Sequence, residues 1–574
     1  MVFAAFRRKA AQLVSDPTLR RWTLERALGR QRPAPSYTPG RPPYIRRLPD
    51  PSARHGLRVS GWSELCAENN GRVFHLPLPG EGIDVSVASA DAIFERAFDD
   101  LEVGLAVHRF AWLPLLGDKV APALVSALWQ SWLRRYRTPS DDWPWHPYTA
   151  AERAVNLLRF GRSKGLPAPL GETLSSLADH AAHIASHLEY HGEHNTSNHL
   201  ANNGRGLFII GLELGLPVYA DLGAQLLVEE ARRIFCPSGV LREGSSHYHL
   251  LLTRSYVECW LWARRHGHVS AGDLETIARQ ALTVLPHLSM PGGFPLVGDI
   301  SPDCPPEYLA GLTTGHKDPS GWLELLSEDD RVLFDGLRRS ASVADDAMLS
   351  LDGWLRAAHG PWSGVWHVAP EGWPPMPGHG HQDCGSFEMH FENEVVIRDL
   401  GRGRYGSAGE GAVAAVSHNG LTVDDIDPYP ANKPYYGESF RASVAPPPTL
   451  RREADGVTVA HPGYRRLGLG IAERRWRFAP DSVVLEDRVA GQGRHRISRR
   501  FHTTLPVELT TSGAVLRGRA AKYRVSADAP ISLRPDTCWT AYGAGVPATR
   551  IEISGESELP WSGSIALSVE RPDS

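Results

Sequence analysis

Residues 378–387 read GHGHQDCGSF and place two histidines two positions apart among glycines. A strand pattern follows, since apolar and polar side chains alternate over the next positions: Phe387, Glu388, Met389, His390, Phe391 and Glu392. Glycine lets the backbone approach a ligand closely, and an imidazole can take a proton or bind a metal ion. The stretch therefore predicts the start of a β-domain with a candidate site at its edge. The alternative is a Gly-rich loop with two solvated histidines.

On the C-terminal side of this stretch, from about residue 361, the hydrophobic period is two. The run ERRWRFAPDSVVLEDRV at 473–489 is typical of a hairpin, and the runs at 495–509 and 549–555 follow the same pattern. The sequence shows no helical pattern of any length after about residue 360. This region predicts an antiparallel β-sandwich or layered sheet.

On the N-terminal side, from about 90 to 357, the spacing is helical. One apolar stripe consists of Leu174, Leu177, Ala181, Ile184 and Leu188. Similar stripes run through 91–110, 120–136, 150–164, 199–215, 219–235, 247–266 and 272–288. Short connections with Gly and Pro predict antiparallel helix hairpins, which close into an (α/α) toroid or stay open as a solenoid. No repeated sequence period favours the solenoid.

The predicted fold class is a multidomain α+β protein. Residues 1–50 are basic and Pro-rich and predict an N-terminal arm, a short helix followed by an extended segment. Residues 51–357 predict the (α/α) toroid, and residues 358–574 predict the antiparallel β-sheet domain.

Composition narrows the possible functions. A net charge of -4 over 574 residues gives no general basic field for nucleic acid. Arginine far outnumbers lysine, which suits planar recognition of carboxylate or sulfate groups. The six cysteines are scattered without a CxxC pair, so neither a disulfide framework nor a thiolate zinc site is indicated. With no signal-peptide pattern and no apolar run of membrane-spanning length, we expect a cytoplasmic protein; a periplasmic location or another route of secretion stays open.

Two polar clusters lie among the earlier predicted helices. WHPY at 145–148 precedes Arg153 and Asn156, which share a helix face, although spacing alone favours a helix cap with a surface arginine. HGEHNTSNH at 191–199 precedes the group Asn202, Asn203 and Arg205. Amides and imidazoles that lead into an apolar helix would be costly if buried without partners, so we favour a polar pocket at this helix N-terminus.

Two further clusters complete the set. REGSSHYH at 242–249 opens a predicted helix, where Tyr248 could act as acid or base; an ordinary helix start with a half-buried tyrosine is equally compatible. His381, Asp399 and His418 are residue types that bind zinc, although their separation in sequence is long.

Together these clusters resemble the heparinase II/III family of polysaccharide lyases, in the family's order over most of the chain. The matching positions are Tyr148, Arg153 and Asn156; Asn198 and His199; EGSSHYH at 243–249; GD at 298–299; HGHQD at 379–383 with Ser386 and Phe387; Asp399; and His418 with Asn419. The resemblance implies a toroid followed by antiparallel sheets, with the active site between them. It also implies β-elimination at a uronic acid, giving a 4,5-unsaturated sugar.

The resemblance also implies roles for individual residues. Asn198 and His199 would neutralise the sugar carboxylate. Tyr248 would act as base, as acid to the leaving O4, or as both, with His379 as its partner. The residues implied to bind substrate are Tyr148, Arg153, Asn156, Arg205 and His247. The residues implied to hold a structural divalent metal, zinc, are His381, Asp399 and His418.

The expected partner is an acidic polysaccharide or oligosaccharide, without nucleic acid or membrane insertion, and a homodimer is left open. The missing signal-peptide pattern differs from secreted relatives and points to imported oligosaccharides or a surface-polysaccharide pathway. The substrate stays open between heparan-like, alginate-like and other uronate polymers. Two alternatives are a glycoside hydrolase, with Glu193, Glu243 and Asp299 as its candidate carboxylates, and a non-catalytic accessory protein.

Overall fold

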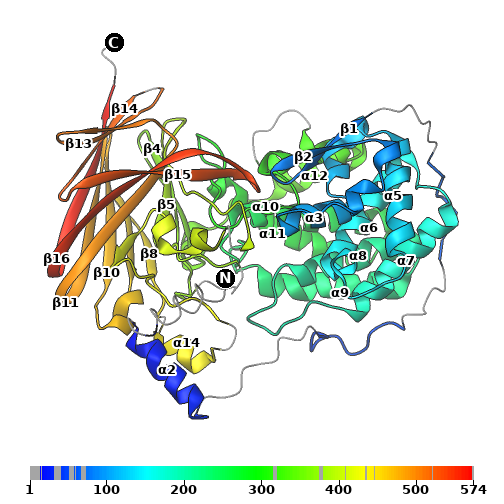
Figure 1. Ribbon diagram of the computed structural model, residues 1–574, viewed down its shortest axis with the longest axis horizontal. Coiled ribbons are helices and arrows are strands. Elements are labelled where there is room, and N and C mark those ends of the chain that lie inside the picture. The colour runs from blue at the N-terminus through cyan, green and yellow to red at the C-terminus, as the bar shows by residue number, and fades with distance from the viewer. Residues whose placement is uncertain are drawn as a thin grey trace.

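The computed structural model describes residues 13, 16–30, 40–50, 57–58, 60–65, 73–313, 320–373, 379–406, 409–433, 436–444, 446–519 and 521–571. Figure 1 shows two parts side by side, helices coloured blue to green on one side and strands coloured yellow to red on the other. This arrangement confirms the predicted multidomain fold, a helical N-terminal region followed by an antiparallel β-domain.

The helical part consists largely of antiparallel hairpins. Its longer helices are α5 (Pro122–Tyr136), α6 (Pro147–Lys164), α7 (Leu170–Ser186), α8 (His199–Leu214), α9 (Pro217–Ile234), α10 (Ser246–His266), α11 (Ala271–Leu288) and α12 (Glu328–Ser340). Helix α8 packs against α9, and α10 packs against α11. Shorter elements are α3 (Leu101–His108), α4 (Trp112–Leu116), α13 (Asp346–Leu351) and a hairpin of β1 (Phe74–Leu78) and β2 (Glu81–Val85). The predicted stripes match helices closely except at 91–110, where α3 occupies only the second half.

Helix α10 shows how local sequence sets these boundaries. The Ser245 hydroxyl caps the helix by accepting a hydrogen bond from the Tyr248 amide at 3.0 Å. Gly267 ends the helix in the left-handed conformation, with φ 63°. Side chains are buried on all faces of α10 up to Ala263, so it is a core helix rather than an amphipathic surface helix. Its first turn is therefore held rigidly where the two parts of the molecule meet.

The β-domain contains two antiparallel sheets. One has the order β3-β4-β5-β6, from β3 (Trp354–His359), β4 (Trp362–His367), β5 (Ser386–Phe391) and β6 (Glu394–Ile397). The larger sheet runs β12-β13-β14-β16-β11-β10-β9-β8, with β15 paired to β16 and β7 paired to β11. Its strands are β7 (Leu421–Val423), β8 (Thr449–Glu453), β9 (Gly456–His461), β10 (Ala472–Ala479), β11 (Ser482–Thr503), β12 (Val507–Thr510), β13 (Gly513–Arg517), β14 (Lys522–Ala527), β15 (Ile531–Ala541) and β16 (Ala544–Glu570).

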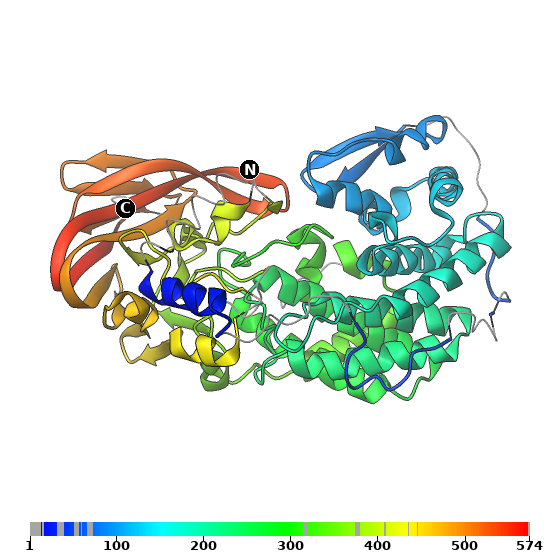
Figure 2. The same ribbon diagram turned by 60° about the horizontal axis from the view of Figure 1, so that its bottom comes forward.

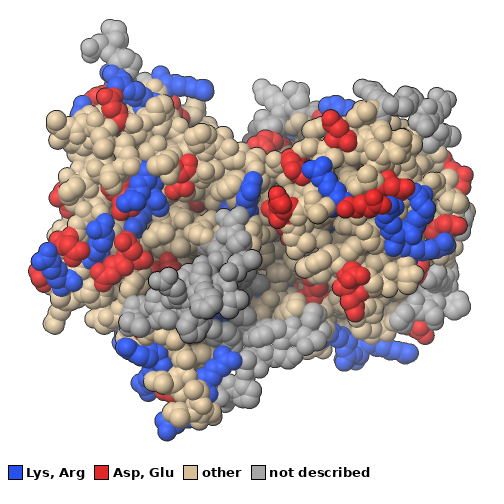
Figure 3. Space-filling view, viewed as in Figure 1, with Lys and Arg blue, Asp and Glu red and all other residues tan. Residues whose placement is uncertain are grey.

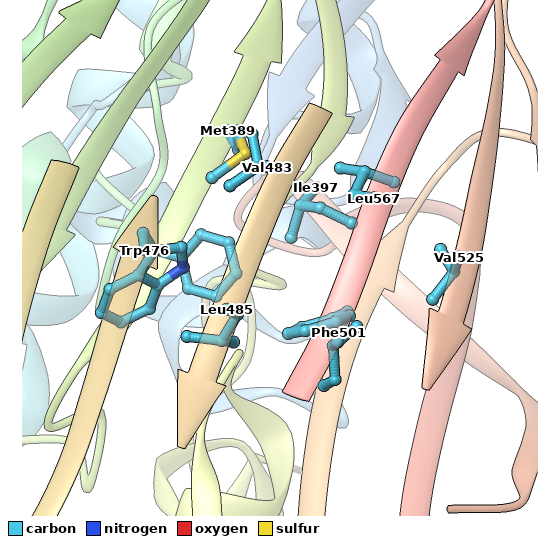
Figure 4. Close-up of a pocket in the computed structure, with 10 residues that line it drawn as sticks. Met389, Ile397, Trp476, Val483, Leu485, Phe501, Val525 and Leu567 are labelled. Carbon is cyan, nitrogen blue, oxygen red and sulfur yellow. The ribbon is translucent and has the colours of Figure 1, made fainter. Parts of the chain in front are cut away.

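The two sheets enclose an apolar core (Figure 4). Met389 and Ile397 come from the smaller sheet, and Trp476, Phe501 and Val525 come from the larger one. A gap of about 20 Å³ remains between them, lined by apolar side chains alone. A space of this size holds no more than about one water molecule. It is a packing gap in the sandwich, and the site for a polar ligand lies elsewhere.

Strand β5 has the predicted alternation, but both of its faces are buried. Phe387, Met389 and Phe391 belong to the core between the sheets. On the other face, His390 accepts a hydrogen bond through Nδ1 from the amide of Gly292, which belongs to the helical part, at 3.0 Å. The helical part thus covers the polar face of β5, so the loop that precedes this strand lies at the boundary between the two parts.

The N-terminal segment contacts both parts of the molecule. Helix α2 (Pro17–Ala27) lies on the β-domain beside α14 (Glu438–Val444), as Figure 1 shows. Trp22 of α2 packs edge-on against Tyr436, with ring centroids 4.9 Å apart. Further along, Gly40 forms a β-bridge with Tyr190 of the helical part. Of the predicted arm, residues 1–12, 14–15 and 31–39 lie outside the described residues. Helix α2 contacts the β-domain, and Gly40 contacts the helical part.

The two parts also meet through hairpin turns. The turn between β15 and β16 approaches the β1–β2 hairpin (Figure 2). A Cβ atom added at Gly80 would lie 2.6 Å from the Cα atom of Gly543, so glycine is required for this close approach. The Tyr542 hydroxyl beside this turn donates to Asp100 of the helical part at 3.1 Å.

Acidic and basic side chains are interspersed on the face shown in Figure 3, in keeping with the small net charge. None of the described helices combines the length and the apolar character needed to cross a lipid bilayer.

Candidate functional site

Loops from both parts of the molecule meet around Tyr248. The helical part contributes the residues before α8, those before α10 and the segment 295–303, whereas the β-domain contributes the residues before β5 and after β6. Tyr248 and His379 lie in contact, with ring centroids 5.3 Å apart in a T-shaped arrangement. The structure therefore brings together the phenol and the imidazole that the sequence places far apart along the chain.

Tyr248 faces a second tyrosine. Its hydroxyl lies 2.8 Å from the hydroxyl of Tyr405, which belongs to the loop after β6. Burial raises the pKa of both phenols well above the ordinary value, and the carboxylate of Asp299 raises both further. Both side chains are consequently protonated at neutral pH and act as hydrogen-bond donors. Sequence reasoning missed Tyr405, because a tyrosine in the loop GRGRYGS has no spacing signal that points to a site.

Asp299 links the two parts of the site. This buried carboxylate of the helical part accepts hydrogen bonds from His379 Nδ1 at 3.0 Å and from His381 Nε2 at 2.7 Å. The Arg402 guanidinium donates to it at 3.3 Å. Burial opposes the charge of Asp299, but the two histidines hold the pKa of its carboxyl well below the usual range. Since Nδ1 of His379 is engaged, Nε2 is the nitrogen left for a substrate.

Asn198 and His199 are each held by a buried carboxylate. The amide N–H and side-chain Nδ2 of Asn198 donate to the two oxygens of Glu243, at 2.7 and 2.9 Å. His199 donates through Nδ1 to Glu189 at 2.7 Å and packs on the ring of Tyr148, with centroids 4.6 Å apart. The His199 side chain is 36% exposed, whereas the Asn198 residue is only 1% exposed. Of the two predicted carboxylate-binding residues, His199 is therefore the accessible one.

The predicted sugar-binding arginines have buried partners instead. Arg153 is 0% exposed, donates to His180 and to the His108 and Pro144 carbonyls, and stacks on Trp132 at 3.9 Å. Arg205, also 0% exposed, pairs with Glu152 at 2.5 Å and with Glu258 at 2.9 Å. These contacts differ from the predicted sugar contacts, because both guanidiniums point into the interior of the helical part.

The other predicted substrate-binding residues also have partners within the helical framework. The Tyr148 hydroxyl donates to Asp303, and the Arg109 guanidinium lies over its ring at 5.0 Å. Asn156 donates to the Arg109 carbonyl at 3.0 Å. His247 accepts a hydrogen bond from the Ser301 amide at 3.0 Å. Tyr148 borders His199, so it is the member of this group closest to the site.

The predicted metal ligands lie together and bond to one another. His418 donates through Nδ1 to Asp399 at 2.9 Å, and its Nε2 lies 3.2 Å from His381 Nδ1. Two nitrogen ligands of one tetrahedral zinc ion lie about 3.3 Å apart, so these two nitrogens have a suitable spacing. Asp399, however, binds the opposite nitrogen of His418. Among the residues that the structure describes, no group of three or more His, Cys, Asp or Glu side chains is arranged to hold a metal ion. Zinc binding here stays a prediction.

The Asp399 carboxylate sets the charge of His418. Burial lowers the pKa of His418, but the neighbouring Asp399 carboxylate outweighs burial and raises it to about 9. A protonated His418 can donate a hydrogen bond through Nε2 to His381 Nδ1 at 3.2 Å.

Comparison with solved structures defines the class of fold. A structure described as heparinase III is 14% identical in sequence, with a TM-score of 0.61, over 98% of this chain and 93% of that chain. A second heparinase III gene product is 16% identical, with a TM-score of 0.55, over 83% of this chain and 80% of that chain. Heparan sulfate lyase HepC from Pedobacter heparinus is 14% identical, with a TM-score of 0.52, over 96% and 87%. The helical toroid followed by antiparallel sheets is thus a fold shared with these proteins.

The sequence of the β-domain is similar to one family. Residues 343–567 match the family model "Heparinase II/III-like, C-terminal". This region is therefore similar to the C-terminal domain of heparinase II/III-like proteins. No curated protein matches the sequence.

Proposed function

We propose that the protein is a polysaccharide lyase that cleaves an acidic, uronic-acid-containing polysaccharide or oligosaccharide by β-elimination. The observation that carries the proposal is the contact of Tyr248 with His379 and Tyr405, because it places proton donors and a proton acceptor from both parts of the molecule at one point. The β-domain that contributes to the site is similar to the C-terminal domain of heparinase II/III-like proteins, and a structural neighbour is described as a heparan sulfate lyase.

The reaction requires a base and an acid near one sugar. We assign His379 Nε2 as the base that removes the C5 proton, since Nδ1 is held by Asp299. Tyr248, protonated because it is buried, donates its hydroxyl proton to O4 as the C4–O4 bond breaks. The electrons of the C5–H bond form the C4=C5 double bond. Tyr405 donates to or accepts from the Tyr248 hydroxyl and so orients it through both halves of the reaction.

The carboxylate of the uronic acid must be stabilised as C5 loses its proton. His199 presents its exposed imidazole edge for this purpose, while Asn198 supports the same loop from a buried position. The catalytic group in this proposal is His199, His379 and Tyr248. Zinc at His381, Asp399 and His418 has a structural role in the proposal, and elemental analysis of the purified protein tests it.

The geometry favours elimination over hydrolysis. A glycosidase needs two carboxyl groups that face each other across the sugar. Glu243 is occupied by Asn198, and Asp299 is occupied by two histidines and Arg402. Glu193 is exposed on its loop. Two of these three carboxylates are therefore occupied, which leaves Glu193 without one of the other two as an opposed partner. A purely binding protein would not require the buried acid and base.

A polysaccharide panel tests the proposal. Heparan sulfate, chondroitin sulfate, alginate and other uronate polymers are incubated with the protein, and products are identified by mass spectrometry and by the ultraviolet absorbance of the conjugated double bond. We expect unsaturated products whose masses add up to that of the substrate. Products that carry one extra water per cleavage would show hydrolysis. If the folded protein forms no product from any polymer of the panel, the proposed function is refuted.

A further inference from the structure

Glu189 is a buried carboxylate behind the exposed His199. It lies on the loop between α7 and α8 and is 5% exposed. One oxygen accepts from His199 Nδ1 at 2.7 Å, and the other accepts from Asn203 Nδ2 at 2.9 Å. The Glu189 amide donates in turn to Asn203 Oδ1 at 3.1 Å. Since His199 and Asn203 are four residues apart on α8, both oxygens of Glu189 are held by one helix face.

This arrangement determines what His199 can offer a ligand. A carboxylate only accepts hydrogen bonds, so Nδ1 of His199 carries a proton. The ring is fixed from the side by Tyr148, and Nε2 lies on the edge opposite Glu189. For Nε2 to donate to a sugar carboxylate it must carry a second proton, which makes the ring an imidazolium between two carboxylates.

The surrounding charges are few. His146 faces Glu189 with Nε2 at 3.4 Å, and its ring lies 6.1 Å from that of His199. Burial lowers the pKa of His146, so this neighbour is largely neutral at pH 7. Arg109 lies over the Tyr148 ring at 5.0 Å and is paired with Glu102 and Asp303. Glu189 keeps its charge: burial raises its pKa, but His199 and His146 together bring it down to about 2.

We infer that Glu189 is a positioning residue that makes His199 selective for sugars with a free carboxylate. It orients the ring through Nδ1 and supplies the negative charge that balances an imidazolium facing the uronate. The inference rests on the proposed function, since it assigns the uronate carboxylate to His199. It excludes a methyl-esterified uronate as the preferred ligand, because the ester has no charge for the imidazolium to match.

The test compares Glu189→Gln with wild type on a uronate oligosaccharide and on its methyl ester. Glutamine keeps an oxygen acceptor for Nδ1 but removes the charge. We expect kcat/KM on the free acid to fall about 10²-fold, the size of effect of removing one stabilising group from a charged transition state. On the methyl ester we expect little change. Glu193→Gln, an exposed glutamate on the same loop, is the matched control and should match wild type on both substrates.

A double-mutant cycle separates positioning from general structure. If Glu189 acts through His199, Glu189→Gln should add no further loss in a His199→Ala background. Equal losses on acid and ester, or full additivity with His199→Ala, would overturn the inference and assign Glu189 to loop stability alone. If Glu189→Gln does not fold, Glu189→Gln/Asn203→Asp keeps the hydrogen bonds between these two residues with donor and acceptor exchanged and moves the negative charge away from His199 to residue 203. The preference for the acid over the ester should then fall in the same direction.

Calorimetric binding of the same two oligosaccharides distinguishes failure of the inference from failure of the proposed function. A wild type that binds the acid more tightly than the ester, with the preference lost in Glu189→Gln, supports the inference even if no product forms. If the wild type makes unsaturated product but Glu189→Gln still prefers the acid as strongly as the wild type does, the proposed function stands and the inference is refuted.

Discussion

The two halves of the site are held in different ways. On the helical side, His199 and Asn198 are fixed by Glu189 and Glu243, carboxylates of the same domain. On the β-domain side, His379 is fixed by Asp299, a carboxylate that the helical part supplies across the boundary. The carboxylates that hold Asn198 and His199 thus come from their own domain, whereas the carboxylate that holds His379 comes from the other domain. Substitutions on the two sides should differ in what they affect.

The largest effect is expected at Tyr248, where the two halves touch. Tyr248→Phe removes the hydroxyl that is proposed to donate to O4 and that pairs with Tyr405. We expect kcat to fall about 10³-fold, within the usual range for loss of a general acid or base. Steady-state production of unsaturated uronate measures this, and a thermal midpoint equal to that of wild type is the control. Activity within a few-fold of wild type would remove Tyr248 from the chemistry.

Asp299→Asn tests the carboxylate of the helical part that binds His379 of the β-domain. The amide can accept through only one oxygen, so it cannot satisfy His379, His381 and Arg402 together. We expect kcat/KM to fall about 10²-fold because His379 is no longer oriented. We also expect the free energy of unfolding to fall by about 3 kcal/mol, since one partner of a buried charged cluster is lost. Retained activity with lowered stability would show that Asp299 only joins the domains.

A smaller effect is expected at Tyr405. Tyr405→Phe keeps the ring that packs against His379 but removes the partner of the Tyr248 hydroxyl. The loss of one neutral hydrogen bond corresponds to about 1 kcal/mol, so kcat should fall roughly five- to tenfold. The measurement is the same assay, and a thermal midpoint equal to that of wild type is the control. A loss as large as that of Tyr248→Phe would make Tyr405 a catalytic residue in its own right.

The smallest effect on catalysis is expected at Arg205. Arg205→Met breaks ion pairs with Glu152 and Glu258 in the interior, and should destabilise the protein by about 3–5 kcal/mol. Because the guanidinium is 0% exposed, KM of the folded variant should equal that of wild type. Chemical denaturation and initial rates at low temperature measure the two quantities. A raised KM with unchanged stability would support the predicted contact between Arg205 and the sugar.

Much of the fold was predictable because hydrophobic period is a local property of the chain. The change from helical spacing to alternation near residue 360 corresponds to the change from α13 to β3. The stripes at 199–215 and 247–266 closely match α8 and α10. The stripe at 91–110 shows the limit of this signal. Helix α3 occupies only its second half, because apolar spacing alone does not distinguish a helix from a packed loop.

Candidate site residues could be predicted where polar residue types cluster in the sequence. They could not be predicted where residues come together only through the packing of the two domains. The loop before α8 and the first turn of α10 carry enough polar residues to be noticed, so His199 and Tyr248 were predicted. Tyr405 was missed and Arg205 was given a sugar contact, because burial and partner choice are properties of packing. Glu258, which pairs with Arg205, lies 53 residues away from it in sequence.

The sequence alone determined two domain types, their order and the loops that carry clustered tyrosine, histidine and amide side chains, because these depend on the spacing of neighbouring residues. Only the tertiary structure decided that Asp299 of the helical part holds His379 and His381 of the β-domain. That choice depends on the docking of β5 and its preceding loop against the segment 295–303, which creates the buried cluster around Asp299. Buried charges are stable only with partners at short distance, and those distances exist only once the two parts have packed together.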